Sequence, residues 1–465
     1  MVADQLTQLI HQFTEAERKR LFEFLSSPYF NKREELLRLA ELVPQNRQDH
    51  LDKRELWRGV YPDLPFDDVK YRLLKSDLLK IIDEFLIQES ASVHDDLRNS
   101  LRLQEQLRSR NLLKRYRSKH RKMEKGTTKA LAGSEWAWLQ YELGRESVRY
   151  KIAQRSTKRQ DFTDLSQQLE RAYLLESLRM ACQGLASQTV DPGELEQSSL
   201  RIILKSAGFE KRLQQDAVLA QYFHCYQMLS QQKNERAFAS FISQLDQFKN
   251  WDRNEARDLL LLAVNYCIRG VNAGDRLAGE QALDLYQFGL DQQLLQERGR
   301  LSRFTFNNIV ALALKSGNVK RARAFIDLYA EQISPAYRQS TAALNQARLA
   351  YEEGQLNEAM QYLQAAEDQD VLTTLNIRVL QLRVYQQLAE QRLFDASLDA
   401  FDIYLRRRKD SLDYHYKAYR KLVSYLRRYR RLNPHEPEKV EDFRHQVMEE
   451  QGLPEKNWLL KMCDG

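Results

Sequence analysis

The sequence predicts an all-α protein, in which an N-terminal helical domain is followed by a right-handed α-α solenoid of helical hairpins. Three observations support this fold class. Helix breakers are scarce, with 16 Gly and 9 Pro in 465 residues. No proline occurs between Pro65 and Pro192, between Pro192 and Pro335, or between Pro335 and Pro434. Apolar residues recur every three or four positions over most of the chain, which is the period of one helix face.

Residues 1–95 are predicted to form an N-terminal helical domain. One amphipathic helix is expected over residues 9–27, ending before Pro28, and a second over residues 31–43. Two more helices are expected on either side of the turn YPDLPFDD, with Asp67 or Asp68 as the N-cap of the last one. The segment therefore predicts a compact four-helix domain.

Part of this domain, LWRGVYPDLPFDDVKYRLLKSDLLKII, also resembles winged-helix regulators that carry a helical repeat domain. That resemblance implies a DNA-facing helix presenting Arg72, Lys75 and Lys80. No signal for a β-hairpin wing precedes or follows the tract. This departure from the family pattern favours a helical N-terminal cap over a winged helix.

Residues 96–130 are predicted to form a basic connecting helix. Residues 98–125 carry eleven Lys and Arg against only two Glu, whereas the whole chain has a formal charge of +7. Its second half is polar on nearly every side, which is typical of a solvated spacer or of a partner-binding arm. Nucleic acid is the main functional alternative, since cations that neutralise phosphates need no specific motif. The candidate contacts are Lys114, Arg115, Arg117, Lys119, Arg121 and Lys122.

Residues 131–410 are predicted to form the solenoid. The stretch AYEEGQLNEAMQYLQAAED reads as two amphipathic helices joined at Gly354, with small residues that permit close helix packing. Equivalent small residues recur at intervals of 45, 40, 37 and 37 residues, and Gln391 falls at the turn of the last unit. These small residues are Ala237, Ala282, Ala322, Ala359 and Ala396. Because a single hairpin cannot bury both of its sides, the pattern predicts a stacked array.

The Gly–x4–Ala–x6–Ala pattern at Gly354, with a small residue seven positions before the glycine, resembles a tetratricopeptide (TPR) repeat. Passages along nearly the whole chain also resemble an uncharacterised bacterial family of TPR-containing proteins. They are FLSSPYFNKREELLRLAEL, RAYLLESLRMAC, AVNYCIRGVNAGD, FTFNNIVALAL and YLRRRK. The resemblance implies a helical solenoid, and it lends no catalytic or ligand residue.

Residues 411–465 are predicted to form C-terminal capping helices, beginning within a second basic segment at residues 406–431. This segment also has eleven Lys and Arg, against two Asp. Its apolar residues step by three or four, which predicts a buried stripe: Leu412, Tyr416, Tyr419, Leu422, Leu426 and Tyr429. The basic residues are expected on the opposite, solvated face: Lys417, Arg420, Arg427, Arg428 and Arg431.

No motif for a chemical reaction was found. The sequence has no phosphate-binding G-x-x-x-x-G-K-[ST] loop, no H-E-x-x-H and no G-x-S-x-G. The four cysteines lie far apart and the histidines are scattered, so no metal cluster is indicated. We therefore expect no enzyme, catalytic residue, cofactor or metal. The absence of a signal-peptide core or a long apolar run favours a cytoplasmic protein without a membrane segment.

The predicted function is a non-catalytic scaffold that binds a peptide or helix of an unidentified protein partner in the concave groove of the solenoid. The first helix of each repeat would line this groove. Its candidate residues are Asn265, Asn307, Asn308, Asn345 and Arg348. The alternative is a nucleic-acid-binding or transcription-regulatory protein that uses the basic helix and a winged-helix-like N-terminal domain.

Overall fold

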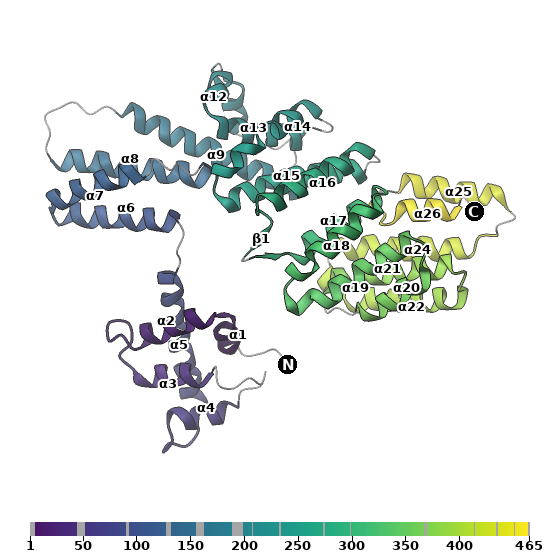
Figure 1. Ribbon diagram of the computed structural model, residues 1–465, viewed down its shortest axis with the longest axis horizontal. Helices are drawn as coiled ribbons and strands as arrows, with labels where there is room; N and C mark the ends of the chain where they lie inside the picture. Colours follow the sequence, from purple (N-terminus) through teal and green to yellow (C-terminus); the bar gives the residue numbers. More distant parts are fainter. Residues whose placement is uncertain are drawn as a thin grey trace. The chain divides into compact units, whose positions relative to one another are not determined.

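Among the described residues of the computed structural model, the named secondary-structure elements are helices except for one short β-hairpin, which confirms the all-α class (Figure 1). The chain divides into two compact units. Unit 1 comprises residues 1–129 and 138–168, and unit 2 comprises residues 130–137 and 169–465. The structure describes residues 5–43, 52–89, 93–126, 132–154, 162–187, 199–206, 208–231, 234–272, 275–297, 299–366, 370–412, 414–433, 436–450 and 452–463.

The N-terminal part of unit 1 contains α1 (Gln5–Gln12), α2 (Glu15–Leu25), α3 (Glu34–Leu42), α4 (Lys53–Val60) and α5 (Asp68–Glu89). The single helix expected over residues 9–27 is two helices, because Thr14 caps α2 in a capping box with Glu17. The sequence T-x-x-E carries that signal. Asp67 is the cap of α5, since its Oδ1 accepts from the backbone N–H groups of Val69 and Lys70.

The basic segment is not one connecting helix. It forms α6 (Val93–Ser109) and α7 (Leu113–Gly126), which pack against each other as a hairpin. Asn111 takes the left-handed conformation at the turn, with φ of 57°. The Arg108 guanidinium makes a two-pronged ion pair, of 2.6 and 3.1 Å, with the buried Glu146 carboxylate on α8 (Ser134–Ala153). The hairpin therefore belongs to a packed helical layer and is not a free spacer.

The continuous part of unit 2 begins within α9 (Thr163–Ser187), and most of this helix belongs to unit 2. The first helices are α11 (Ser199–Leu204), α12 (Phe209–Gln215), α13 (Ala217–Ser230), α14 (Glu235–Ile242) and the 3-10 turn η2 (Leu245–Asn250). Then come α15 (Arg253–Asn272), α16 (Arg276–Asp291) and the antiparallel pair β1 (Gln296–Glu297) and β2 (Arg300–Leu301).

The rest of unit 2 continues as helical hairpins. Its elements are α17 (Arg303–Lys315), α18 (Val319–Tyr329), η3 (Ala330–Gln332), α19 (Pro335–Glu352), α20 (Leu356–Ala365), α21 (Val371–Gln387) and α22 (Gln391–Arg407). The C-terminal helices are α23 (Lys409–Leu412), α24 (Tyr414–Arg430), α25 (Pro437–Glu449) and α26 (Lys456–Cys463).

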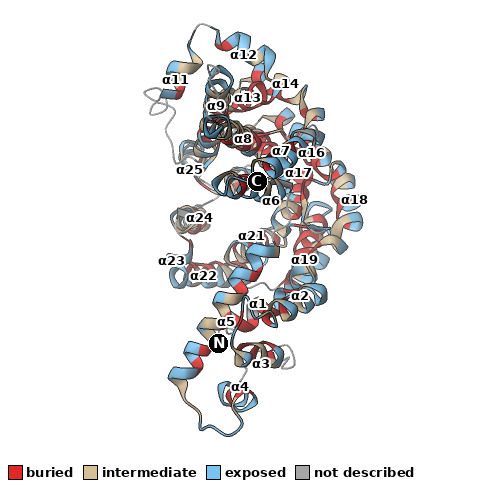
Figure 2. Ribbon diagram, turned by 90° about the vertical axis from the view of Figure 1, so that its left-hand side faces the viewer, coloured by how far each residue is buried: buried red, intermediate tan, exposed pale blue. Residues whose placement is uncertain are grey.

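Consecutive helices of unit 2 pack against each other from α15 to α22. Each helix contacts the next, and α19 also contacts α17 and α21, the first helices of the hairpins before and after it. Figure 2 shows buried residues on the helix sides that face a neighbour, with exposed residues on the outer sides. Each hairpin therefore buries one side internally and a second side against the next hairpin.

Three hairpin turns share one feature, a residue with positive φ two positions before the second helix. Gly317 and Gly354 have φ of 74° and 78°, and each lies two residues before the second helix of its hairpin. In the hairpin of α21 and α22, this place belongs to Ala389, with φ of 56°. The sequence prediction of Gln391 at that turn is wrong, because Gln391 already begins α22.

This two-residue offset also changes which small residue is equivalent. Ala237, Ala282, Ala322 and Ala359 are buried as predicted. Ala396 is exposed, and Phe394 takes the buried position five residues after the turn residue. An aromatic ring therefore occupies the place that alanine holds in the two preceding hairpins.

The second basic segment is partly neutralised by aspartates of α22, which pair with four of its eleven cations. Asp402, with a side chain only 2% exposed, pairs with Arg406, Arg420 and Arg427. Arg427 also reaches Asp399 (2.7 Å), and Arg430 binds Asp395. The predicted stripe is confirmed, since Leu412, Leu422 and Leu426 are buried and the tyrosines pack partly buried beside them. The expected solvated face is wrong for Arg420 and Arg427, which bridge α24 to α22.

The positive φ shared by these turn residues predicts opposite effects for two matched substitutions. Gly354→Ala should destabilise unit 2 by about 1 kcal/mol, because alanine disfavours positive φ. A Cβ at Gly354 would meet no atom within 4 Å, so the cost is conformational alone. Ala389→Gly should stabilise by only about 0.5 kcal/mol, because relief of the positive φ is partly offset by the greater entropy of glycine in the unfolded chain. Urea unfolding measures both, and a destabilised Ala389→Gly variant would contradict this prediction.

Asp402→Asn should destabilise unit 2 by about 2–3 kcal/mol. The substitution leaves three arginines without the carboxylate that they share. The expected loss of stability is smaller than for a fully buried ion pair, because the guanidinium groups are partly exposed to solvent. The matched control is Asp399→Asn, whose side chain is 69% exposed, with an expected loss below about 1 kcal/mol. Thermal unfolding of both variants checks this, and equal losses would refute the central role of Asp402.

Candidate functional site

Three of the five predicted groove residues lie together in unit 2. The Asn345 side chain on α19 donates from Nδ2 to the Asn307 Oδ1 on α17 (2.5 Å) and to the Thr341 carbonyl (2.8 Å). The Arg348 guanidinium donates to the Asn307 carbonyl (3.3 Å) and to Asn345 Oδ1 (3.1 Å). Asn345 is fully buried, whereas Asn307 and Arg348 are half-buried. The three side chains form one polar contact between α17 and α19.

The other two predicted residues lie apart from this contact. Asn265 is exposed on α15. Asn308 is exposed on α17 and its side chain hydrogen bonds to Tyr286 on α16. Consecutive residues of a helix point about 100° apart, so Asn308 and Asn307 cannot serve the same surface.

Arg348 is the electrostatically unusual member of this group. Burial lowers its pKa to about 10, an effect partly offset by the nearby Glu455 carboxylate and reinforced by the cationic Arg383. Within the described part of the chain no carboxylate forms an ion pair with Arg348, and its hydrogen-bond acceptors there are neutral. A partly desolvated cation without a direct ion pair is costly, and such groups gather at binding sites.

Arg383 and Glu455 extend the same polar row and were missed by the sequence analysis. Arg383 on α21 lies 3.5 Å from Glu352 and 3.6 Å from Glu455, with its guanidinium over the Tyr351 ring. Burial would lower the pKa of Arg383, but Glu455 and Tyr351 outweigh it and the pKa is raised. Nothing in the sequence links Glu455, next to α26, with Arg383, a residue 72 positions earlier. We call Asn307, Asn345, Arg348, Arg383 and Glu455 the polar row.

The basic face of α7 is the second candidate site. All six predicted cations, Lys114, Arg115, Arg117, Lys119, Arg121 and Lys122, are exposed. Arg117 donates from Nε to the Tyr150 hydroxyl (2.6 Å). The other five have no partner among the described residues. The six cations that the sequence analysis offered as nucleic-acid contacts therefore lie on the exposed side of a helix that is packed on its other side.

The N-terminal cations provide no comparable surface. Arg72 pairs with Asp68 (2.6 Å) and Lys80 with Asp77 (3.0 Å). Residues 5–43 and 52–89 contain helices and turns but no strand. The wing that the winged-helix resemblance implies is therefore not found within those residues.

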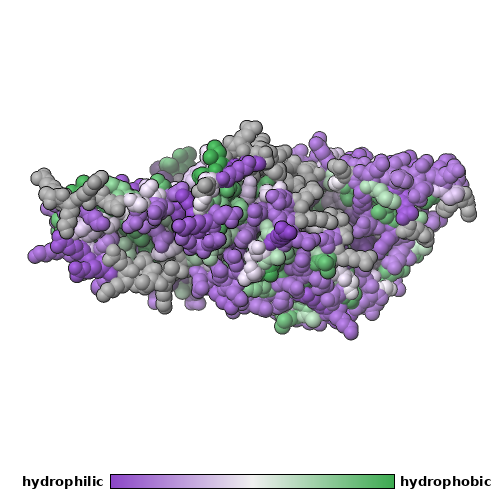
Figure 3. Space-filling model, turned by 90° about the horizontal axis from the view of Figure 1, so that it is seen from above, coloured by the Kyte–Doolittle hydropathy of each residue, from purple (hydrophilic) through white to green (hydrophobic). Residues whose placement is uncertain are grey.

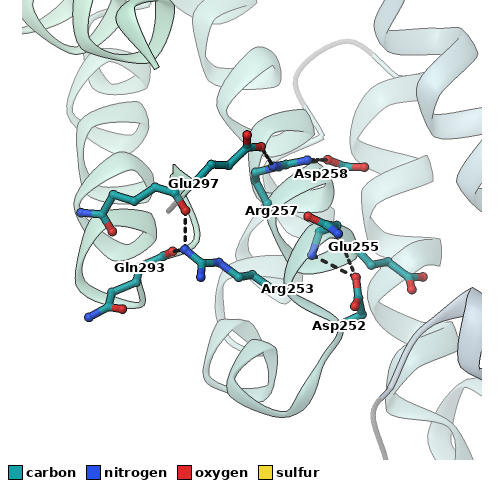
Figure 4. A network of polar contacts seen from close by, with 9 residues as sticks. Asp252, Arg253, Glu255, Arg257, Asp258, Gln293 and Glu297 are labelled. Atoms are coloured by element: carbon teal, nitrogen blue, oxygen red, sulfur yellow. Dashed lines mark hydrogen bonds and ion pairs between the residues drawn. The ribbon is translucent and has the colours of Figure 1, made fainter. Parts of the chain in front are cut away.

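A buried carboxylate at the start of α15 is the strongest acid–base candidate outside these sites. Glu255 is 8% exposed, and its carboxylate accepts hydrogen bonds from the Ser134 backbone N–H (2.5 Å) and the Tyr222 hydroxyl. Burial raises its pKa. Figure 4 shows the surrounding network: Asp252 accepts from the Glu255 N–H, and Arg253 and Arg257 reach Gln293 and Glu297. Two contacts hold residues 132–134 against the start of α15. One is the Ser134–Glu255 hydrogen bond, and the other is the backbone bridge between Ala132 and Trp251.

Cavities and metal-type clusters give no further site. A cavity of about 150 Å³ lies between α16, α17 and α18, and its charged wall residue, Arg321, is already engaged with the Leu283 carbonyl, Glu280 and Asp284. Among the described residues, no three His, Cys, Asp or Glu side chains gather as metal ligands. Within the same residues, every helix is too short or too polar to cross a membrane. The face in Figure 3 is mostly hydrophilic, with apolar residues in small separate groups.

Comparison with known proteins gave no relative. No protein-family model matches the chain, and neither a curated protein nor a solved structure matches it. The resemblances to the TPR repeat and to a bacterial TPR-containing family therefore rest on the sequence passages quoted above. The structure itself defines an all-α protein with two candidate sites, the polar row and the basic face of α7.

Glu255 predicts a specific pH dependence of stability. Its pKa is raised in the folded chain, so the unfolded chain loses this proton first as pH rises from about 4.5. The stability that Glu255 contributes is full below that pH and is lost as pH rises through the folded-state pKa. Glu255→Gln should remove this component, so the variant gains stability relative to the parent between acid and neutral pH. Thermal unfolding across pH measures it, with the exposed Glu358→Gln as control. A constant difference across pH would contradict the assignment.

Proposed function

We propose that unit 2 is a right-handed solenoid of TPR-like hairpins that serves as a non-catalytic scaffold, holding an acidic segment of a partner protein against the polar row. The successive packing of α15 to α22 supports the solenoid. The recurrent positive-φ turn residue followed five positions later by a buried side chain supports the repeat. A cytoplasmic location remains a prediction from the sequence.

The unpaired state of Arg348 is the observation that carries the proposal. A carboxylate from a partner would supply the counter-ion that the described residues do not provide. A guanidinium binds a carboxylate through a two-pronged ion pair, which is stronger than the present bonds of Arg348 to neutral oxygens. Asn307 and Asn345 hold the guanidinium in place, so little ordering is required on binding.

The position of Glu455 indicates that the polar row favours carboxylates as ligands. Its carboxylate already lies 3.6 Å from Arg383, a long ion pair, and it acts on the pKa of both Arg383 and Arg348. The chain thus places one carboxylate of its own beside the polar row. A partner carboxylate would add to or replace it, which makes acidic segments the preferred ligands over basic or apolar ones.

Peptide binding by the full chain tests this function. An array of 15-residue peptides with graded numbers of Asp and Glu would be probed at physiological salt. We expect retention to rise with acidic content, and Arg348→Gln to weaken the best acidic peptide at least tenfold, about 1.4 kcal/mol. The matched control is Arg392→Gln, an exposed arginine of α22, which should bind as the parent does.

Three results would oppose the proposal. They are equal binding by Arg348→Gln and the parent, equal losses in Arg348→Gln and Arg392→Gln, and retention independent of acidic content. Circular dichroism of both variants separates a lost contact from a lost fold, and an Asn345→Asp variant gives a second test. An added carboxylate beside Arg348 should compete with the peptide and weaken binding without removing the arginine.

A further inference from the structure

The exposed side of α7 is basic across its full width. At 100° per residue, the buried Tyr116 and Met123 share one side with the half-buried Leu113 and His120. The remaining arc of about 200° carries six cations and Ser118, with no carboxylate among residues 113–123. Those cations are Lys114, Arg115, Arg117, Lys119, Arg121 and Lys122.

The two basic segments differ in how much of their charge is paired. Residues 98–125 and 406–431 carry the same excess of basic residues. In the second segment, aspartates of α22 pair with Arg420, Arg427 and Arg430, and Glu450 pairs with Lys421. On α7, the cations other than Arg117 have no partner among the described residues. Their positive charge is therefore open to an external anion.

The helix that presents these cations is held by aromatic and polar contacts. The Tyr116 ring stacks on Tyr150 of α8, with centroids 4.0 Å apart and planes 5° apart. His120 Nδ1 lies 3.1 Å from Gln104 Oε1 on α6, and Gln104 Nε2 donates to the Met123 sulfur. The basic face is thus fixed before a ligand arrives, which reduces the entropy lost on binding.

From this surface we infer that α7 binds the sugar–phosphate backbone of a nucleic-acid duplex without reading its sequence. The described helix is about 20 Å long, and a duplex presents one negative charge about every 1.7 Å of its axis. A row of cations repeating about every 6 Å along the helix suits such a repeated charge better than a single carboxylate. This inference is independent of the peptide scaffold proposed for unit 2.

Two features favour a duplex over other polyanions. The aromatic rings of α7 are turned inward, so the face offers no platform on which unpaired bases could stack. The exposed arc also carries no apolar side chain, whereas a helix that inserts into a membrane surface needs an apolar face.

Fluorescence anisotropy with a labelled 30-base-pair duplex tests the inference on the full chain. The α7 variant combines Lys114→Gln, Arg115→Gln, Lys119→Gln and Arg121→Gln, all exposed and without partners, so the helix should stay folded. We expect the parent to bind with an affinity that falls steeply with salt. The variant should bind at least tenfold more weakly, and its slope of log affinity against log salt should be shallower by about three.

The control removes four exposed cations from unit 2 with the same change in net charge: Arg407→Gln, Arg408→Gln, Lys409→Gln and Lys417→Gln. It should bind the duplex within threefold of the parent. A comparable loss in the control would show that net charge, and not α7, causes binding. No duplex binding at low salt would also overturn the inference, as would tighter binding to a single strand of the same length or to anionic lipid vesicles. Duplex DNA and duplex RNA each support it, because the contact is to the backbone.

Discussion

The packing of α19 is the constraint on which the hairpins from α17 to α22 depend. This helix contacts α17, α18, α20 and α21, and its residues belong to two hydrophobic clusters, with Leu349 in one and Ala343, Leu344, Ala347 and Ala350 in the other. A helix with neighbours on so many sides must bury its polar stripe as well. Asn345 and Arg348 therefore hydrogen bond to each other and to Asn307 between α17 and α19, and the polar row is a direct result of the packing.

The sequence predicted the fold class and the hairpin rhythm, because both depend on local patterns of apolar and small residues. Its failures have local physical causes. Ala389 adopts a conformation usually taken by glycine, so the turn was placed two residues late and Ala396 was chosen in place of Phe394. The capping box at Thr14 was readable and was missed. The α6–α7 hairpin was read as one helix because its turn uses Asn111 and contains neither glycine nor proline.

The candidate sites were predictable in residue type but not in partnership. Asn307, Asn345 and Arg348 were found because they are polar positions on the first helices of hairpins. Arg383 and Glu455 could not be found, since tertiary packing alone brings α21 and the residue before α26 together. By composition alone the two basic segments are equivalent, since each has eleven Lys and Arg against two acidic residues. Only the aspartates of α22, spaced to face α24, distinguish a segment whose charge is used internally from one whose charge is not.

Among the described residues, arginines occur in three contrasting environments, and each implies a different role. Around Asp402 the guanidiniums share a buried carboxylate and hold two helices together. On α7 they are solvated, so their attraction to anions is long-ranged and weakened by salt. At Arg348 the guanidinium is desolvated, so its attraction is short-ranged and resists screening. Salt dependence therefore separates the two candidate sites: binding at α7 should collapse as ionic strength rises, while binding at the polar row should persist.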